Sequence, residues 1–504
     1  MAQCAPEDFQ TALHELAGPP DEPTPSAPLE AASRAAQLPA DLAELDLCAA
    51  AALIAAGHIR SAELTEAVIA RAERAQSQLN CFLRLDIDEA RTAAAHADRR
   101  RNSGAPLGPL HGLPLAHKDM FDRAGKVALL GARMPAEPAA QNAVVIARLR
   151  AAGAFEIGAL HMSEFAIGPI GDNAHYGRCR NAIDAEYMSG GSSSGSAVAT
   201  AAHACLASLG SDSGGSVRIP AAANGIVGLK PTYGLVPLEG AMRLAPSVDH
   251  IGLVTRTVRD CARLLGVVAN DGRGTTGSTR SDPRRYEATL NAGIEGLRIG
   301  IVRNYFRDGM SADVAVAQDR SLTVLHEAGA ELIDVQAPDP EPLAELSRTL
   351  LYAEATAVHG WRLRHYAGRY SPQVRVRAAT GLAIPASIYY EALCLRGLLL
   401  REFVAGAFAR CDVLHMPTLV IPVPRFAEVD VGSGPALWQT LARLVQNTAP
   451  FNYLGLPALA LPAGRTANGL PASVQLVARP FAERLLLRVA AAHEAGFATG
   501  HDSG

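Results

Sequence analysis

Short apolar segments with the character of β-strands alternate with helical segments along most of this chain. The strand-like segments are PLAHKD, AFEIGAL, CLASLGSD, GIVGLK, LRIGIVR, ELIDVQ, DVLHMPT, ALALPAG and ASVQLVA. Such alternation is typical of an α/β fold, in which helices cover a sheet on both faces. We therefore predict a large, twisted, mixed and mostly parallel sheet with helices on both of its faces.

The composition of the 504 residues fits a globular protein with a large core. Hydrophobic residues make up 49% and charged residues 19% of the chain, which excludes a disordered or collagen-like protein. The 46 Lys and Arg residues nearly balance the 50 Asp and Glu residues, so the chain has no excess of positive charge that would attract nucleic acid or an acidic membrane. The longest Ala-rich run, 197–209, is too short to cross a bilayer. We expect neither a nucleic-acid nor a membrane partner, and the sequence is compatible with a homodimer.

Features of the N-terminal part and of the cysteines indicate an intracellular compartment. The first 30 residues contain no Lys or Arg and no continuous apolar segment, which differs from a secretory signal. The eight cysteines form no CxxC pair and no zinc-binding spacing, which favours reduced and mostly buried thiols. We therefore expect a cytoplasmic protein.

Composition also suggests how the chain is divided. Residues 1–44 are rich in Pro and Ala and predict a leader that lies on the surface, followed by a single α/β domain over 45–504. Helical patterns begin at Leu45, and Ser61 is a plausible N-cap of the next helix. The segment 351–408 is helical and rich in Arg, Tyr and Leu, which predicts a cap that packs on the sheet or forms a wall of the substrate pocket.

Two clusters of glycine and serine stand out, at 189–196 (SGGSSSGS) and at 211–218 (SDSGGSVR). The first leads into a helix former and the second follows a strand-like segment, so neither is a flexible linker. Serines on tight glycine turns present a hydroxyl while backbone N–H groups point at a reacting oxygen. Neither cluster matches a phosphate-binding motif. The first formally satisfies GxSxG with Ser193 at its centre, but the segment before it is typical of a loop rather than of the strand that a nucleophile elbow needs.

A third segment, HGLPLAHKD, places Lys118 after a short apolar run. Ser192 follows Lys118 by 74 residues, and Ser216 follows Ser192 by 24 residues. Together with GIVGLKPTYG, the HIG at 250–252 and the later GLPA and GLP, these segments closely resemble the amidase signature family of serine hydrolases. The resemblance extends over about residues 45–495, and it implies the amidase signature fold.

The resemblance also implies a Ser–Ser–Lys triad. Ser216 is then the nucleophile, Ser192, in a cis peptide, relays its proton, and Lys118 is the base. The chemistry requires such a base, because a serine hydroxyl is a poor nucleophile at neutral pH. Lysine can serve only when burial away from carboxylates keeps it neutral. Asp119 is adjacent in sequence, but in an extended segment its side chain points to the opposite face.

Further site residues follow from the same resemblance, which implies no metal and no cofactor. The backbone N–H groups of the second cluster form an oxyanion hole, and neighbouring residues support the triad and this loop. Cys179 departs from the usual pattern near the expected pocket, and as a nucleophile it would need a histidine such as His175. The oxyanion-hole residues are Ser213, Gly214, Gly215 and Ser216, and the supporting residues are Ser211, Asp212, Arg218, Gly190 and Gly191.

We interpret the chain as an amidase that hydrolyses a small-molecule carboxylic amide through an acyl-enzyme. Two alternatives use the same signature: the A subunit of a glutamine-dependent amidotransferase, and an esterase or carbamate (urethane) hydrolase. An inactive scaffold is disfavoured because all three triad positions are intact. The expected pocket segments, 162–187 and 351–451, mix aromatic and aliphatic residues with few charges, which favours an uncharged or aromatic substrate.

We predict that turnover survives a metal chelator. The sequence contains no HExxH motif, and its three His-Glu pairs, at 14–15, 326–327 and 493–494, lack a second histidine at the required spacing. The sharpest form of the assay uses Cys179→Ala, because a bulky alkylating adduct on that thiol would block the pocket. This variant should keep most of its activity with chelator present. Activity that chelator abolishes and zinc restores would contradict a metal-free mechanism, and loss in Cys179→Ala alone would implicate the thiol.

Overall fold

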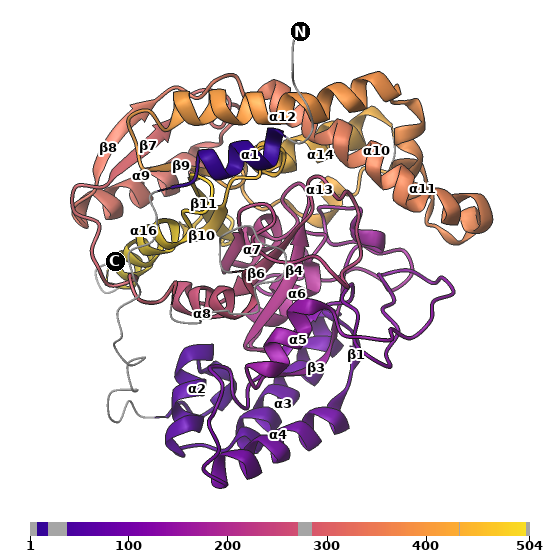
Figure 1. Ribbon diagram of the computed structural model, residues 1–504, viewed down its shortest axis with the longest axis vertical. Coiled ribbons are helices and arrows are strands. Elements are labelled where there is room, and N and C mark those ends of the chain that lie inside the picture. The colour runs from indigo at the N-terminus through magenta and orange to yellow at the C-terminus, as the bar shows by residue number, and fades with distance from the viewer. Residues whose placement is uncertain (1–7, 19–37, 271–284, 433, 500–504) are drawn as a thin grey trace.

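The computed structural model describes residues 8–18, 38–270, 285–432 and 434–499, and its strands form two sheets (Figure 1). The nine segments predicted as strands all coincide with strands of these sheets, whereas β1 and β6 were not predicted. The small sheet has the order β1 (Phe82–Leu85), β3 (Phe155–Leu160), β2 (Pro114–Lys118). The large sheet has the order β4 (Ala207–Asp212), β6 (His250–Thr255), β5 (Val227–Lys230), β10 (Ala458–Arg465), β11 (Pro471–Ala478), β9 (Val413–Pro417), β7 (Arg298–Val302), β8 (Glu331–Val335).

Antiparallel pairs dominate the large sheet. Of its seven neighbouring strand pairs, five are antiparallel, and only β7 pairs in parallel, with β8 and β9. The predicted mixed sheet is confirmed, but the expected majority of parallel pairs is not found. One reason is the short connection between β10 and β11, because adjacent strands joined by a few residues pair antiparallel and parallel neighbours need a long crossover.

The two sheets meet beside β4, which β2 contacts. The backbone N–H of Leu209 in β4 donates to Nδ1 of His117 in β2 at 3.0 Å. Lys118, the last residue of β2, therefore lies near the end of β4, where the second Gly/Ser cluster begins. The meeting of the two sheets is what brings these distant segments together.

Helices cover both faces of the large sheet, as predicted (Figure 1). Adjacent side chains of β6 point into different layers: Leu253 packs in the cluster that contains α8 (Val258–Val268), whereas Val254 packs with Ala221 of α7 (Arg218–Asn224). Helices α3 (Ser61–Leu79) and α4 (Ile87–Asn102) pack on the small sheet, and α2 (Leu47–Ala56) and α5 (Val144–Ala151) contact α8. One face of the large sheet carries α8 (Val258–Val268), α9 (Ala312–Glu327) and α16 (Glu483–Thr499), and the other carries α6 (Ser194–Ala201) and α7 (Arg218–Asn224).

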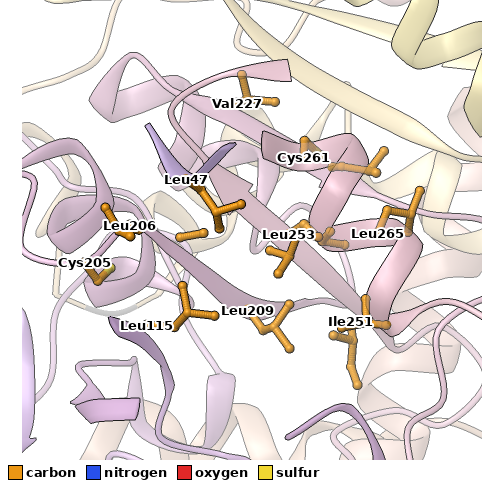
Figure 2. Packing of buried hydrophobic residues seen from close by; sticks show 14 of the residues in the cluster. Leu47, Leu115, Cys205, Leu206, Leu209, Val227, Ile251, Leu253, Cys261 and Leu265 are labelled. Atoms are coloured by element: carbon orange, nitrogen blue, oxygen red, sulfur yellow. The ribbon is translucent and has the colours of Figure 1, made fainter. Parts of the chain in front are cut away.

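Side chains between β4, β6 and α8 form the centre of the core (Figure 2). Leu209, Ile251, Leu253, Cys261 and Leu265 are fully buried there. Complete burial of a leucine or isoleucine side chain contributes about 1.5–3 kcal/mol. This layer therefore holds β4 firmly, and β4 leads directly into the second Gly/Ser cluster.

Part of the predicted leader is folded. Helix α1 (Asp8–Glu15) packs against α12 (Ala386–Ala407), with Phe9 and Leu13 buried. The Arg396 guanidinium of α12 lies 3.5 Å from the centre of the Phe9 ring, a cation–π contact. Most of the Pro-rich part of the leader, residues 19–37, lies outside the described residues, and the division at residue 44 stays a prediction.

The predicted helical cap is a set of helices beside the large sheet. Its main parts are α10 (Glu341–Tyr366), α11 (Pro372–Ala379) and α12, and two further helices, α14 (Pro435–Val445) and α15 (Ala449–Tyr453), follow later in the chain. Within the described residues no single helix is long and apolar enough to span a membrane. The segment Pro372–Ala383 with α12 passes that test only as a pair bent by 87°.

The start of α3 differs from the prediction. The helix begins at Ser61, so its N-cap is Arg60, whose backbone N–H donates to Glu63. The N–H groups of Ser61 and Ala62 instead donate to the Asp98 carboxylate of α4. A neighbouring helix thus supplies the capping oxygens, which local sequence does not reveal.

A hydroxyl of α9 joins two buried histidines. Ser321 Oγ lies 2.8 Å from Nε2 of His415 in β9 and 2.8 Å from Nε2 of His493 in α16. Burial lowers the pKa of His415 to about 3 and that of His493 to about 4. The folded protein keeps both rings neutral, whereas the unfolded chain protonates them below about pH 6.5. Their contribution to stability is therefore present above that pH and is lost as the pH falls toward 4.

We predict that His493→Gln makes stability less sensitive to acid. With one buried histidine fewer to protonate, the free energy of unfolding should fall less steeply between about pH 6.5 and 4.5, by up to about 1.4 kcal/mol per pH unit. Urea unfolding at a series of pH values measures this slope. The exposed His58, changed to Gln, is the matched control, and a His493→Gln slope equal to that of the parent would contradict the prediction.

Candidate active site

Lys118 ends β2 inside the protein, with 1% of its surface exposed. Its Nζ donates to Ser192 Oγ at 2.7 Å and to Ser211 Oγ at 2.8 Å. Burial lowers the pKa of Lys118 to about 7, and the charges of Asp212 and Asp249 oppose this shift only partly. A lysine with this pKa is substantially neutral at physiological pH and can accept a proton.

Asp119 does not pair with this lysine. Its Oδ2 accepts the backbone N–H of Leu129 at 2.8 Å, and burial raises the pKa of its carboxyl. The neighbouring carboxylate that would keep Lys118 charged is thus engaged elsewhere.

Ser192 lies in the loop that leads into α6, and the Gly191–Ser192 peptide bond is cis. Its carbonyl accepts the backbone N–H of Ser163 at 3.1 Å. Gly190 has a φ of +73°, which only glycine adopts easily. At Gly191, a Cβ atom would lie 2.6 Å from the carbonyl oxygen of Gly168. The two glycines therefore allow the loop to pack where Ser192 meets Lys118.

Ser216 lies between β4 and α7 and is half-buried. The backbone N–H of Ser193 donates to the Ser216 carbonyl at 3.2 Å, which joins the two Gly/Ser clusters next to Ser192. The Ser216 and Ser192 hydroxyls, which both lie among the described residues, form no hydrogen bond with each other. Of the predicted relay, the contact between Lys118 and Ser192 is formed, and contacts within catalytic sites often tighten only when substrate binds.

Ser193, the centre of the GxSxG match, has a different environment. Its Oγ accepts the Ser211 N–H and donates to the Ser211 carbonyl, both at 3.2 Å. The side chain is fully buried. Residues 181–188 before this cluster form no strand, only isolated bridges from Met188 to Arg180 and from Tyr187 to Arg425. These contacts give Ser193 a structural role that ties the first cluster to β4.

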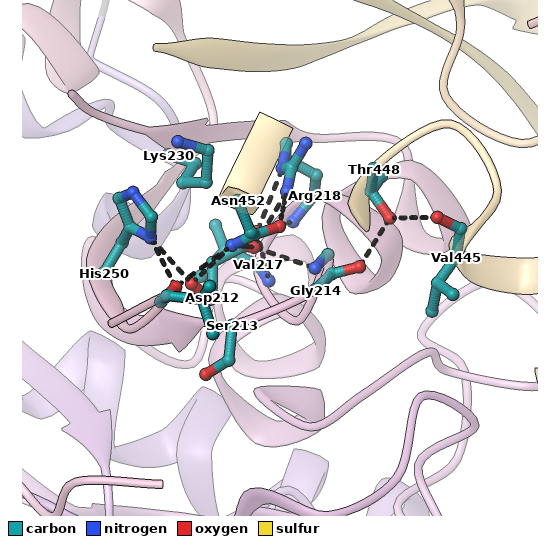
Figure 3. A network of polar contacts seen from close by, with 12 residues as sticks. Asp212, Ser213, Gly214, Val217, Arg218, Lys230, His250, Val445, Thr448 and Asn452 are labelled. Carbon is teal, nitrogen blue, oxygen red and sulfur yellow. Dashed lines mark hydrogen bonds and ion pairs between the residues drawn. The ribbon is translucent and has the colours of Figure 1, made fainter. Parts of the chain in front are cut away.

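The loop from Ser213 to Ser216 is held by side chains on either side (Figure 3). Thr448 Oγ1 donates to the Gly214 carbonyl at 2.6 Å. The Gly215 N–H donates to Asp212 Oδ1 at 2.8 Å, so this amide anchors the loop. The amides of Ser213, Gly214 and Ser216 make no hydrogen bond among the residues that the structure describes, which leaves three donors for an oxyanion.

A buried ion pair supports this loop (Figure 3). Arg218 contacts both oxygens of Asp212, at 3.0 and 2.8 Å, and both side chains are fully buried. Burial opposes ionisation of Asp212, but the Arg218 guanidinium outweighs it and holds the pKa of that carboxyl well below its usual range. Asn452 and Gln475 complete the network, with Asn452 Nδ2 donating to Asp212 and Gln475 Oε1 accepting from Arg218. Neither was predicted from the sequence, since each comes from a distant segment.

Ser216 opens into a narrow pocket of about 80 Å³. Both segments predicted to line it do so. Among its described lining residues are two guanidinium groups, those of Arg348 and Arg377, and no carboxylate. The remaining lining is mainly apolar and includes Ile167, Pro169, Leu244, Leu351, Tyr352, Trp438, Leu441 and Val445.

Other side chains proposed or available as base or nucleophile are occupied. Nδ1 of His117 accepts the Leu209 N–H, and burial lowers the pKa of this ring to about 3. Burial raises the pKa of the Cys179 thiol to about 12, so it forms no thiolate. Nε2 of His175 lies 3.1 Å from Glu164. Within the described ranges, no three His, Cys, Asp or Glu side chains gather as metal ligands.

A buried lysine that contacts serine hydroxyls, beside a loop with free amides, fits the class of serine-type hydrolases. The model of the family described as Amidase matches residues 63–487. The chain therefore belongs to the amidase family, and it is a hydrolase that acts on amide C–N bonds.

Proteins of known sequence support this assignment. The A subunit of glutamyl-tRNA(Gln) amidotransferase from Chloroflexus aurantiacus is 38% identical over 489 residues, which covers 90% of this chain and 97% of that protein. The corresponding protein of Myxococcus xanthus is 35% identical over 483 residues, with 90% and 97% covered.

Solved structures agree with the fold. The crystal structure of an amidase superposes with a TM-score of 0.80 at 34% identity, covering 90% of this chain and 99% of that one. Native peptide amidase from Stenotrophomonas maltophilia superposes with a TM-score of 0.75 at 29% identity, covering 90% and 96%. The amidase signature fold predicted from the motifs is thereby confirmed.

We predict that activity rises with pH through about 7, because only neutral Lys118 accepts a proton and burial lowers its pKa to about 7. Lys118→Ala should lose about 10²- to 10⁴-fold in kcat, the usual contribution of a general base. The pH dependence of kcat/KM for the parent, and kcat for the variant, measure both effects. Full activity in Lys118→Ala, with activity lost instead in His117→Asn or His175→Asn, would contradict the assignment.

Proposed function

We propose that this chain hydrolyses a carboxylic amide through an acyl-enzyme on Ser216, with Ser192 and Lys118 as its proton relay. The observation that carries the proposal is the buried contact of 2.7 Å between Lys118 Nζ and Ser192 Oγ. Burial among hydroxyl groups keeps this lysine neutral, so it forms no ion pair that would stabilise the fold. A role as proton acceptor therefore explains its position best.

The proposed steps follow from this arrangement. Ser216 Oγ attacks the amide carbon while its proton passes to Ser192 Oγ, and the Ser192 proton passes to Lys118 Nζ. The amides of Ser213, Gly214 and Ser216 stabilise the oxyanion. The proton returns by the same route to the leaving nitrogen, and the C–N bond breaks to give an amine and the acyl-enzyme. Water, deprotonated through the same relay, then releases the carboxylic acid and regenerates Ser216.

The pocket lining supports an amide with an apolar acyl group as substrate. Its apolar wall includes Leu351, Trp438 and Leu441, and its charged groups are the cations of Arg348 and Arg377. Free glutamine carries an α-carboxylate, which these arginines could pair, and an α-ammonium group, whose burial is costly without an anionic partner. Because no carboxylate stands among the described residues of this lining, we favour an apolar or aromatic amide over glutamine.

The main alternative is a role as the A subunit of a glutamine-dependent amidotransferase. It is supported by the 38% identity to the Chloroflexus aurantiacus protein. Such a role needs partner subunits and glutamine, whereas an amidase turns over amides by itself. A panel of aryl amides, primary amides, glutamine, esters and carbamates, assayed with the purified chain, separates these functions.

Cytoplasmic location and a homodimer stay predictions.

We predict that the purified chain hydrolyses aryl or alkyl amides faster than glutamine, and that Ser216→Ala stays folded with no turnover on any of them. The reason is that Ser216 is the one cluster serine that is only half-buried, and it lies next to free amides and faces the pocket. The matched control is Ser193→Ala, which removes a buried structural hydroxyl and should keep most activity.

Mass spectrometry after treatment with a fluorophosphonate locates the nucleophile in the same preparation. The adduct should lie on Ser216. An adduct on Ser193 would replace the proposed triad with a nucleophile elbow. Turnover of glutamine only, and only after partner subunits are added, would favour the amidotransferase.

A further inference from the structure

A second carboxylate, Asp249, contacts the loop at residues 213–216, which we call the oxyanion loop. It directly precedes β6 and is 4% exposed. Its Oδ1 accepts the Ser213 hydroxyl at 2.6 Å, and its Oδ2 accepts the backbone N–H groups of Leu244 and Ala245 at 2.8 and 3.0 Å. Three donors on one buried carboxylate fix its orientation and, through it, the segments that donate.

The two segments that Asp249 joins both face the reacting serine. Ser213 and Leu244 line the same pocket as Ser216. Ser213 is also the first of the three residues whose amides are free. Asp249 therefore connects an oxyanion donor to the wall that a bound acyl group would touch.

Each residue of the loop before Ser216 has its own anchor. Asp212 holds the amide of Gly215, and Thr448 holds the carbonyl of Gly214. The hydroxyl of Ser213 is held by Asp249. Without this last contact, the peptide that carries the Ser213 N–H would keep its link to β4 but lose the side-chain contact that sets its angle.

We propose that Asp249 is a positioning residue for amide hydrolysis, which holds the Ser213 amide toward the oxyanion and the Leu244 wall against the acyl group. The inference rests on the proposed function and adds to it a residue outside the triad and the Asp212–Arg218 pair. Positioning of this kind acts mainly in the transition state, where charge develops on the oxygen.

Electrostatics gives Asp249 a second, separable effect. Its charge raises the pKa of Lys118 against the larger, opposite effect of burial. Burial raises the pKa of Asp249 itself, the three donors lower it, and the charge of Glu354 from α10 raises it further. Tyr233 also faces this carboxylate. A neutral side chain at this position should therefore lower the pKa of Lys118 and move the acid limb of the pH profile to lower pH.

Three variants and one control test the inference. Asp249→Asn removes the charge and disturbs the donors, Ser213→Ala removes only the hydroxyl contact, and Ser213→Thr keeps the hydroxyl. The control is Ser208→Ala in β4, whose buried hydroxyl donates to the Leu209 carbonyl away from the pocket. Each protein is checked for folding by circular dichroism and for fluorophosphonate labelling at Ser216.

We predict that Asp249→Asn lowers kcat about ten- to hundredfold, with KM changed less than about threefold, and moves the acid limb to lower pH. Ser213→Ala should lower kcat less and leave the acid limb in place, and Ser213→Thr should restore most of kcat. Ser208→Ala should match the parent.

A folded Asp249→Asn protein with the parental kcat and an unmoved acid limb would overturn the inference. If Asp249→Asn fails to fold, the two Ser213 variants test the inference instead. A parental kcat in Ser213→Ala would then overturn the inference. Failure of the proposed function gives a different result, because the parent itself would then remain unlabelled at Ser216 or turn over none of the amides by itself.

Discussion

Lys118 is buried among hydroxyl groups, and the function of the rest of this site depends on that burial. An ammonium ion removed from water without an anionic partner is costly, so the neutral amine becomes favoured. Its two side-chain contacts, Ser192 and Ser211, can each donate or accept, which allows a proton to move along the contact. Lys230 is also buried, but it donates to two backbone carbonyls, which cannot relay a proton. Burial alone therefore does not make a base.

The oxyanion loop lies close to this lysine, and its anchors must not raise the pKa of Lys118 enough to restore its positive charge. Asp212 anchors the loop, and an unpaired carboxylate there would raise the pKa of Lys118 strongly. Arg218, bonded to both oxygens of Asp212, offsets part of that charge. Removing one partner of such a buried pair typically costs about 3–5 kcal/mol. The pair thus serves the geometry of the loop and the neutrality of the lysine together.

Much of this architecture could be predicted from the sequence, because strands with apolar patterns and long motifs are local signals. Nine strands and the triad segments were found in this way. The unpredicted β6 pairs with both β4 and β5, and these pairings belong to the assembled sheet rather than to its own local sequence. The contacts of Asn452 with Asp212, and of Asp98 with the start of α3, join segments far apart in sequence. The direction of strand pairing was likewise a property of the assembled sheet.

Direct titration of Lys118 is the sharpest test of whether this lysine is the base. The chain has only three lysines, Lys118, Lys126 and Lys230, so protein labelled with ¹³C at the lysine Cε carbon gives few signals, and Lys118→Met identifies the one that disappears. We expect the chemical shift of this signal to titrate with a midpoint near 7, as burial lowers the pKa of Lys118 to about 7. A midpoint at the ordinary lysine value of about 10.4 would contradict the mechanism, because Lys118 would then be charged at neutral pH and unable to act as the base.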